Sequence, residues 1–426
     1  MSIIKQVQEF LEQKEKKIIT QNFVSLFLLQ GANYILPLLI LPFLVRILGA
    51  EKFGLIMFAQ SLVSFLNVFV DFGFNISGTR EISIARNQKQ KVGEIFIAIM
   101  LIKFCLVVIS FGVLLLLIGS FTRFSIDSNI YILSFGVVIG QACFPVWFFQ
   151  GIEKMKVVTY VNVFAKIIFT VLVFFFIDNE QDYFKVPIYN SLGFIVSGFF
   201  GLIFSFKFFT FKLPTFGLIK QLFFDSFSLF ISNLAISLYT ASNVFILGLF
   251  SGNALAGVYS SIEKLILAIK NIYVPLYQAL YPWVSRQNNE KVKMIICKIK
   301  PFVFLLGMVI AIFILCFAEN ILALVYKDPI ITSYSIVFRV LCFISLFSGL
   351  NMLYNVLYFP AVKRYKVRMN ILIFGGLFSV IMNLIFVQFF SIYGVAIIVT
   401  ITELLLVLIG SFYFKKISSE MEIIKP

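Results

Sequence analysis

The sequence predicts an all-α polytopic membrane protein, with twelve transmembrane helices in two pseudo-symmetric six-helix bundles around a central cavity. Of its 426 residues, 61% are hydrophobic and only 13% are charged, whereas a soluble domain has about 45–50% apolar and about 25% charged residues. Each helical span needs about 20 apolar residues, so the chain has enough for about a dozen. The long apolar runs lack the alternation of a membrane β-barrel. This composition excludes a soluble enzyme, a secreted domain and a DNA-binding module.

Apolar runs separated by charged or turn residues define the predicted spans. They cover residues 22–45, 54–76, 95–119, 130–150, 157–177, 188–210, 226–250, 257–282, 302–325, 333–358, 370–390 and 394–414. Each should be helical, because lipid offers no partners for backbone N–H and C=O groups. Residues 1–21 are polar and rich in lysine. We expect them to form a cytoplasmic tail without a cleavable signal.

Lysine and arginine are unequally distributed between the predicted loops. The two tails and the even-numbered loops carry 25 of them, and the odd-numbered loops carry five, namely Arg46, Lys52, Arg123, Lys185 and Lys327. Because basic loops remain in the cytoplasm, we expect both termini there. The net charge of +15 then reflects membrane topology, and no nucleic-acid partner is expected. The short outer loops leave no room for a folded catalytic domain.

A short repeat at an offset of 203 residues predicts the two-bundle arrangement. Residues 25–27 match residues 228–230, and Gly49 and Gly54 match Gly252 and Gly257. The match places the first span on the seventh, as in transporters whose two halves move around a central site. We expect an N-terminal lobe at 22–211, a C-terminal lobe at 212–414 and a cytoplasmic tail at 415–426.

Several kinds of chemistry lack their usual residues. The chain has no histidine, so a histidine base, metal site or proton relay is excluded. Its five cysteines have no Cys-x-x-Cys spacing, which argues against disulfides and zinc ligands. No nucleotide-binding Gly-x-x-x-x-Gly-Lys-Ser/Thr loop is present. We therefore expect no catalytic residues, no metal site and no bound cofactor, with H⁺ or Na⁺ as the candidate coupling ion.

Five basic residues lie inside predicted spans: Lys103, Lys166, Lys264, Lys270 and Arg339. Each costs about 2.5–3.5 kcal/mol at the centre of a membrane helix. Only three acids are clearly internal, Asp71, Glu263 and Glu403, which leaves a basic excess. The first interpretation is a water-filled cationic cavity that binds an anionic group such as phosphate. Structural salt bridges and snorkelling towards the membrane surface are the alternatives.

Aromatic side chains are mostly expected to be lipid-facing or core filler. Tyr273, Tyr277 and Tyr281 differ, because they recur every four residues on the predicted helix of Lys270. Pro275 should kink this helix. The tyrosines are candidates for the cavity lining. Asn351 and Asn355 form a similar stripe, which hydrogen bonds between helices explain at least as well.

The three internal acids are candidates for coupling to a cation gradient. A carboxylate in low dielectric readily takes up a proton or helps to bind Na⁺. Glu403 is the first choice because its own helix carries no basic neighbour. The equally weighted alternative is that Glu403 pairs with Arg339 or with a lysine of the eighth span.

Four segments of the chain form recognisable motifs: residues 71–81 (DFGFNISGTRE), 145–155 (PVWFFQGIEKM), 275–282 (PLYQALYP) and 393–403 (YGVAIIVTITE). Together they resemble the Wzx-type polysaccharide-unit flippases of the multidrug/oligosaccharidyl-lipid/polysaccharide exporter superfamily. The resemblance implies two six-helix lobes around a V-shaped cavity in the bacterial cytoplasmic (inner) membrane. It implies a cargo of undecaprenyl-pyrophosphate-linked oligosaccharide, moved to the outer leaflet for O-antigen, lipopolysaccharide or capsule biosynthesis. It also implies a basic cavity that holds the pyrophosphate, with cation gradients driving the cycle. By position in these motifs, Asp71, Lys166, Lys264 and Lys270 would be its site residues.

The partners implied by the resemblance are the lipid-linked oligosaccharide, the membrane, and the polymerase and chain-length proteins of the same pathway. Two other classes remain open. A polysaccharide polymerase or ligase normally carries a large outer loop, which the short outer loops disfavour. A drug exporter of the same superfamily would take cations and should have a net acidic cavity.

The charge distribution leads to a topology prediction. Reporter or cysteine tags at residues 285–300 should be accessible from the cytoplasm, and tags at residues 178–185 from outside, because the first region is basic and the second is not. Labelling of intact cells with an impermeant thiol reagent would measure this. The reverse pattern would overturn the predicted orientation and the direction of transport with it.

Overall fold

The computed structural model describes residues 13–285 and 287–423, and every regular element in these ranges is a helix, with no strand. In this part of the chain, nine helices or helix runs are long and apolar enough to cross a membrane. The predicted all-helical membrane class is confirmed. The count of twelve spans stays a prediction.

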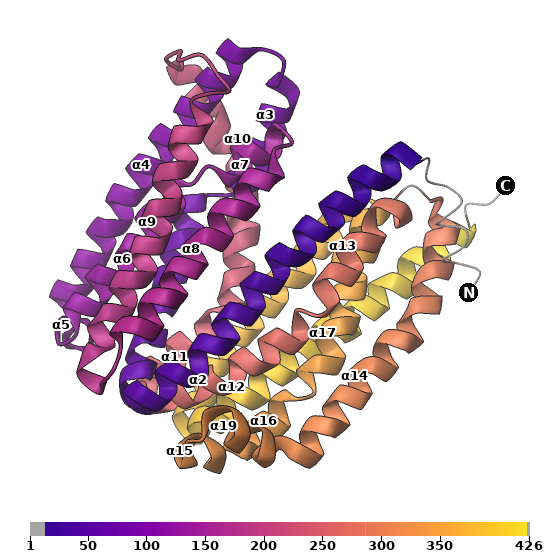
Figure 1. Cartoon of the computed structure of the whole chain (residues 1–426). Helices are drawn as coiled ribbons and strands as arrows, with labels where there is room; N and C mark the ends of the chain where they lie inside the picture. Colours follow the sequence, from indigo (N-terminus) through magenta and orange to yellow (C-terminus); the bar gives the residue numbers. More distant parts are fainter. Residues whose placement is uncertain (1–12, 286, 424–426) are drawn as a thin grey trace.

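Two very long helices each contain a break. Helix α2 (Gln13–Asp71) and helix α19 (Tyr365–Ile423) have 59 residues each. The backbone leaves helical geometry at Gly49, with φ +69°, and at Ser391, with φ +48°. Figure 1 shows α2 reversing its direction at its lower end. Both breaks fall where the sequence predicts turns, between residues 45 and 54 and between residues 390 and 394.

The remaining helices are mostly short segments of the predicted spans. In chain order they are α3 (Phe74–Ala85), α4 (Lys89–Ser120), α5 (Thr122–Ser125), α6 (Ser128–Cys143), α7 (Val146–Gly151), α8 (Met155–Phe176), the 3₁₀ helix η1 (Glu180–Phe184), α9 (Lys185–Ser205), α10 (Phe216–Thr240), α11 (Ser242–Phe250), α12 (Asn253–Lys270), α13 (Tyr273–Val284), α14 (Asn289–Tyr326), α15 (Pro329–Ser333), α16 (Ser335–Leu341), α17 (Ile344–Met352), the π-helix η2 (Leu353–Tyr358) and α18 (Phe359–Ala361). Polar side chains cap some of them. Thr215 accepts from the Leu218 N–H at the start of α10, and Asn288 accepts from the Lys291 N–H at the start of α14.

The helices form two groups that meet at one end and diverge towards the other (Figure 1). The first helix group contains α3 to α9 and the part of α2 after Gly49. The second contains α11 to α19. Where the groups meet, a buried hydrophobic cluster includes Phe53 of α2, Leu247 of α11 and Tyr259 of α12. Burial of these side chains holds the two groups together at that end.

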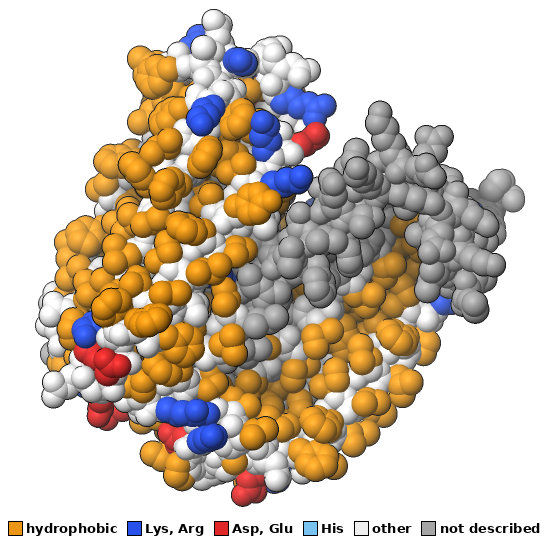
Figure 2. All heavy atoms as spheres, in the orientation of Figure 1, with side chains coloured by type: hydrophobic (Ala, Val, Ile, Leu, Met, Phe, Trp, Pro, Cys, Tyr) orange, Lys and Arg blue, Asp and Glu red, His pale blue; other side chains and the backbone are white. Residues whose placement is uncertain are grey.

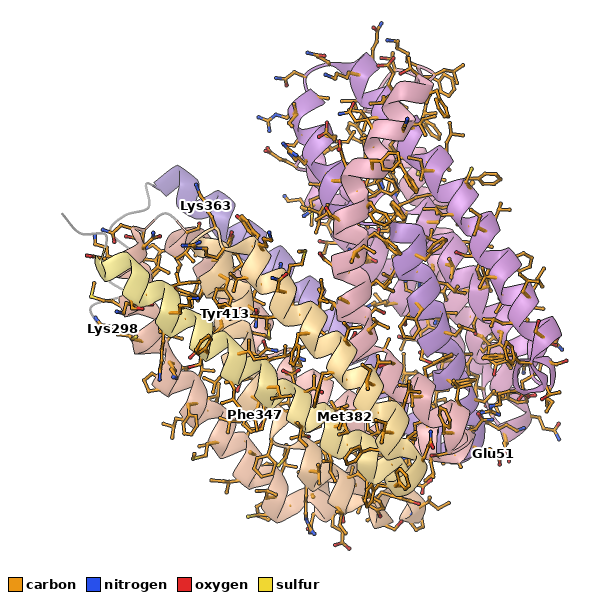
Figure 3. All side chains as sticks on the ribbon, turned by 180° about the vertical axis from the view of Figure 1, so that it is seen from behind. Glu51, Lys298, Phe347, Lys363, Met382 and Tyr413 are labelled. Carbon is orange, nitrogen blue, oxygen red and sulfur yellow. The ribbon has the colours of Figure 1, made fainter. Side chains whose placement is uncertain are left out.

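Apolar side chains cover the flanks of both groups, and most visible charged side chains lie towards the ends (Figure 2). On α4, for example, Phe104 and Leu116 are exposed, as expected for contact with lipid. From behind, Lys298 and Lys363 lie at one end of the molecule and Glu51 at the other (Figure 3). This separation matches the predicted basic and non-basic sides.

Two helix segments outside these groups, α2 before Gly49 and α10, connect the groups. Before Gly49, α2 runs beside the second group (Figures 1 and 3), and Arg46 donates to the Tyr326 carbonyl at the end of α14 over 2.9 Å. Helix α10 starts against the first group, where Ser226 Oγ is 2.7 Å from Ser77 Oγ of α3. Its later part lies against Gly376 of α19. The predicted boundary at residue 212 therefore precedes a helix that both groups share, and the domain limits stay predictions.

The two groups touch through a pair of glycines. A Cβ added to Gly54 of α2 would lie 2.7 Å from the Gly257 nitrogen of α12 and would overlap the Asn253 carbonyl oxygen. Five residues before each of them, Gly49 (φ +69°, ψ +169°) and Gly252 (φ +88°, ψ +173°) share a backbone conformation that favours glycine. These are the four glycines of the sequence repeat. The two repeats thus have the same local structure here and meet face to face.

We expect Gly54→Ala and Gly257→Ala each to destabilise the protein by about 1–3 kcal/mol, because the methyl group would press against backbone that cannot move aside. The midpoint of thermal unfolding of the detergent-solubilised protein measures this. Gly112→Ala on α4 is the matched control, since nothing lies within 4 Å of its added Cβ. Equal midpoints for all three variants would contradict the close contact.

Candidate functional site

Five predicted spans, the second, fourth, seventh, eighth and tenth, are interrupted in the structure. The breaks lie between α2 and α3, α6 and α7, α10 and α11, α12 and α13, and α16 and α17. At the first break, Phe72 and Gly73 both have positive φ. Asp71 is the last residue before this break, and Lys270 is the last before the break in the eighth span. In transporters, discontinuous helices commonly form the substrate and ion sites.

Three cavities of about 520, 370 and 250 Å³ adjoin one another. Residues of both helix groups line the first two, and residues of the first group alone line the third. Met57, Gln60 and Lys264 line both the first and the second. The first and third share Asn67, Asp71, Asn75 and Gln141. Because they share walls, we treat the three as one space, the central chamber.

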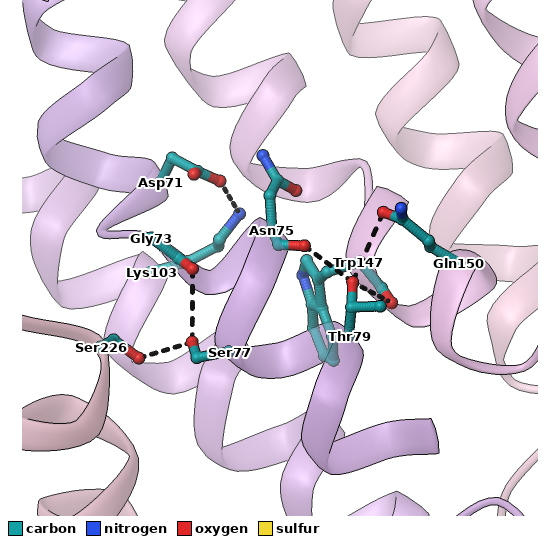
Figure 4. Close-up of polar contacts among 9 residues, drawn as sticks. All are labelled: Asp71, Gly73, Asn75, Ser77, Thr79, Lys103, Trp147, Gln150 and Ser226. Carbon is teal, nitrogen blue, oxygen red and sulfur yellow. Dashed lines mark hydrogen bonds and ion pairs between the residues drawn. The ribbon is translucent and has the colours of Figure 1, made fainter. Parts of the chain in front are cut away.

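Three of the five predicted bases line the central chamber. Lys264 borders the first and second cavities, Lys166 the second and Lys103 the third. Lys103 Nζ lies 3.4 Å from Asp71 Oδ1, and this lysine side chain is only 4% exposed (Figure 4). Lys264 makes no ion pair with any acid in the described part of the chain. With Asp71 and Glu263 as the acids, the chamber lining has one more basic than acidic residue.

Glu263 connects the chamber to buried amides of the second group. Its Oε1 accepts from Asn243 Nδ2 over 3.4 Å, and Asn243 Oδ1 accepts from Asn383 Nδ2 over 3.1 Å. These residues come from α12, α11 and α19. The bonds offset part of the cost of holding a carboxylate away from water.

Lys270 and Glu403 lie together inside the second group, outside the residues that line the chamber. Their side chains form an ion pair, and Asn351 Nδ2 donates to the other carboxylate oxygen of Glu403 over 2.9 Å. Asn355 in turn donates to Asn351 over 2.7 Å. Glu403 therefore pairs with a lysine of the eighth span, which is the alternative left open by the sequence. The asparagine stripe serves contacts between helices.

Tyr273, Tyr277 and Arg339 also lie apart from the chamber-lining residues. The two tyrosine hydroxyls donate to the backbone carbonyls of Ser345 (2.9 Å) and Gly349 (2.7 Å). They attach α13 to α17. The Arg339 Nε is buried and has no hydrogen-bond partner within the described ranges. Pro275, predicted to kink this helix, has a side chain outside the described set, and the break at Asn271 and Ile272 precedes it.

Ten of the nineteen residues that line the first cavity are uncharged and polar, and none of them is among the site residues predicted from the sequence. On α2, Gln60, Ser64, Asn67 and Asp71 follow one another at spacings of three or four residues. On α10, Asn233, Ser237 and Thr240 have the same spacing. A polar stripe at helical spacing in an apolar span is a readable signal. Apart from Asp71, these residues carry no charge, so a prediction based on buried charges does not include them.

Two of the motif segments pack against each other beside the chamber (Figure 4). Thr79 Oγ1 donates to the Asn75 carbonyl over 2.7 Å and to the Trp147 carbonyl over 3.1 Å. A Cβ added to Gly78 would lie 3.0 Å from the Trp147 ring. Contacts between residues 71–81 and 145–155 therefore hold α3 against α7. Packing between these helices explains much of the residue pattern in the two motif segments.

Three solved structures share the fold. An inward-facing multidrug resistance MATE family transporter of the MOP superfamily has a TM-score of 0.71 at 14% identity, covering 92% of this chain and 96% of that chain. An outward-facing one scores 0.59 at 14% identity, with coverages of 95% and 96%. The lipid II flippase MurJ in an inward closed conformation scores 0.63 at 16% identity, with coverages of 92% and 87%.

Sequence relatives identify the family. A protein of Escherichia coli (strain K12) is 33% identical over 276 residues, which are 63% of this chain and 66% of that protein. One of Shigella dysenteriae is 29% identical over 271 residues, 62% of this chain and 67% of that protein. Both are named "Putative O-antigen transporter", and the matches span about two thirds of their lengths. The family model described as polysaccharide biosynthesis protein matches residues 19–288. The resemblance of the motifs is confirmed, and the chain belongs to the polysaccharide biosynthesis protein family.

Proposed function

We propose that this protein is a transporter, a flippase that moves undecaprenyl-pyrophosphate-linked oligosaccharide units from the cytoplasmic to the outer leaflet of the bacterial inner membrane. The observation that carries the proposal is the central chamber, which extends between the two helix groups and is lined by Lys103, Lys166 and Lys264. Bases at this depth are costly, and an anionic phosphate would offset that cost. The names of the two relatives support the same class of cargo.

The proposed route is alternating access across twelve spans with both termini in the cytoplasm. The end where the groups meet would then face outwards. Besides Gly54 and Gly257, Arg123 of the first group contacts this end of the second group. Its guanidinium donates to the Gly248 carbonyl over 2.9 Å and to the Asn253 side chain. Opening to the outside requires these contacts to break, while the cytoplasmic ends approach each other.

The chamber charges favour an anionic cargo over a cationic drug. Lysines outnumber acids among its described lining residues, and a site for cations would need the opposite. In this proposal, the polymerase and chain-length proteins of the pathway act on the unit after it has crossed. The chain itself then provides binding and movement, without a covalent step.

Lys264→Ala should abolish surface polysaccharide in cells that lack their own transporter, with a normal amount of the protein in the membrane. Loss of one charged phosphate contact should weaken cargo binding roughly 10- to 100-fold. Lys264→Arg should restore more polysaccharide than Lys264→Gln, because only arginine keeps the charge. Immunoblots of surface polysaccharide and of membrane protein measure the two quantities.

Two variants serve as controls for Lys264. Lys156→Ala, at an exposed position of α8, should leave both quantities unchanged. Lys270→Ala should lower the protein level, because it leaves Glu403 buried and unpaired, at a cost of about 3–5 kcal/mol. Normal polysaccharide with Lys264→Ala would remove this residue from the cargo site.

We further propose that H⁺ or Na⁺ is coupled to the cycle through the chamber acids. Asp71 and Glu263 line the chamber, where water can bring a cation to them, whereas Glu403 is 3% exposed and paired. A cation that neutralises Asp71 would weaken its ion pair with Lys103, so the two groups would exchange partners as the cation binds and leaves. Each charge that crosses 100 mV contributes about 2.3 kcal/mol to this exchange.

Asp71→Asn should retain cargo binding in proteoliposomes but lose acceleration by an imposed pH or Na⁺ gradient, because Lys103 no longer has an ionisable competitor. Transport of lipid-linked units with and without the gradient measures this. Glu51→Gln, an exposed acid in the turn after Gly49, should respond as the wild type does. A wild-type response from Asp71→Asn would exclude Asp71 from coupling.

A further inference from the structure

The largest cavity of the central chamber is lined by five amide side chains: Gln60 and Asn67 of α2, Asn75 of α3, Gln141 of α6 and Asn233 of α10. Within the described residues, none of these side chains makes a hydrogen bond to the protein. The amides of the second group differ, since Asn243, Asn351, Asn355 and Asn383 are all hydrogen-bonded to other side chains. The five chamber amides are therefore free to bind a ligand.

These amides suit a polyhydroxylated ligand. A side-chain amide has two N–H donors and a carbonyl acceptor in one plane, and neighbouring sugar hydroxyls both donate and accept. No aromatic ring occurs among the described residues that line this cavity, so recognition would rest on hydrogen bonds and not on stacking. A volume of about 520 Å³ falls within the roughly 300–1,000 Å³ of small-molecule sites.

Two of the lysines do not line the cavity that contains all five amides, although Gln60 reaches the wall shared with Lys166, and Asn67, Asn75 and Gln141 reach the wall shared with Lys103. Lys166 borders only the second cavity and Lys103 only the third, whereas Lys264 lies where the first and second cavities adjoin. A cargo with a charged and a sugar portion would then place the phosphate towards Lys166 and Lys264. Its sugars would extend into the amide-lined cavity.

We propose that Gln60, Asn67, Asn75, Gln141 and Asn233 form a sugar-binding face that selects the oligosaccharide, distinct from the lysines that hold the pyrophosphate. This inference rests on the proposed flippase function. It assigns the specificity for the sugar to the walls of the first helix group and α10. The amides add affinity only when a sugar is attached to the lipid.

The test uses the full-length protein in nanodiscs and two probes. One probe is undecaprenyl pyrophosphate without sugar, and the other is the lipid-linked repeat unit isolated from a polymerase-deficient strain of the source bacterium. Wild-type protein should bind the sugar-bearing probe at least tenfold more tightly. Each amide should contribute roughly two- to tenfold. Asn67→Ala combined with Gln141→Ala should remove most of this difference and leave binding of the sugar-free probe unchanged.

Control variants separate the causes of failure. Gln388→Ala, at an exposed amide of α19, should behave as wild type, and Lys264→Ala should weaken binding of both probes. Equal wild-type affinities for the two probes would overturn the sugar-binding face and leave the flippase proposal standing. Loss of sugar-free binding in the amide variant would also overturn it, since the amides would then be structural. Wild-type protein that binds neither probe would overturn the flippase proposal and this inference together.

Discussion

The contact between Gly54 and Gly257 is the constraint from which the arrangement of the site follows. Two helix backbones touch there without intervening side chains. The next turns of the two helices can therefore form two walls of the same cavity, one wall from each helix. Gln60 and Glu263 both lie six residues beyond their glycine, about 9 Å along the helix axis, and both line the chamber. Beside this contact, the two groups are also packed together by the buried hydrophobic cluster that includes Phe53, Leu247 and Tyr259. The groups thus touch at the point from which the chamber opens.

Charges in a membrane interior need partners or water, and this chain uses both. Lys270 and Glu403 are enclosed in the second group with two asparagines that satisfy the carboxylate. Removing one partner of such a pair destabilises the fold by more than the intact pair stabilises it. Lys103 and Asp71 pair at the chamber wall, where water can reach the carboxylate, which is 23% exposed. The enclosed pair suits a structural role, and the pair at the wall is able to change partners.

The class of the fold, its helical spans and two of its turns were predictable because hydropathy and glycine act locally. The contact between the repeats was predictable in part from the offset of the four glycines. The residues that line the site were less predictable. Whether a charged residue faces the chamber or a neighbouring helix depends on how each helix is rotated, and the sequence does not contain that information directly. Lys264 and Lys270 are six residues apart on α12, yet only Lys264 lines the chamber. Tyr273 and Tyr277 form a convincing stripe, but it faces α17.

The two repeats have diverged in a way that explains how one chamber can hold a cargo with two different portions. At equivalent positions, 203 residues apart, Gln60 corresponds to Glu263 and Ser61 to Lys264. At these two positions the first repeat supplies neutral hydrogen-bonding groups and the second supplies charges, while Asp71, Lys103 and Lys166 are the charged lining residues of the first repeat. Neutral bonds are individually weak and exchange readily with water, while the charged contacts are strong but respond to protonation and salt. A carrier must release what it binds. Dividing the binding between these two kinds of contact allows release to begin with the few charged groups, after which the remaining bonds can be replaced by water one at a time.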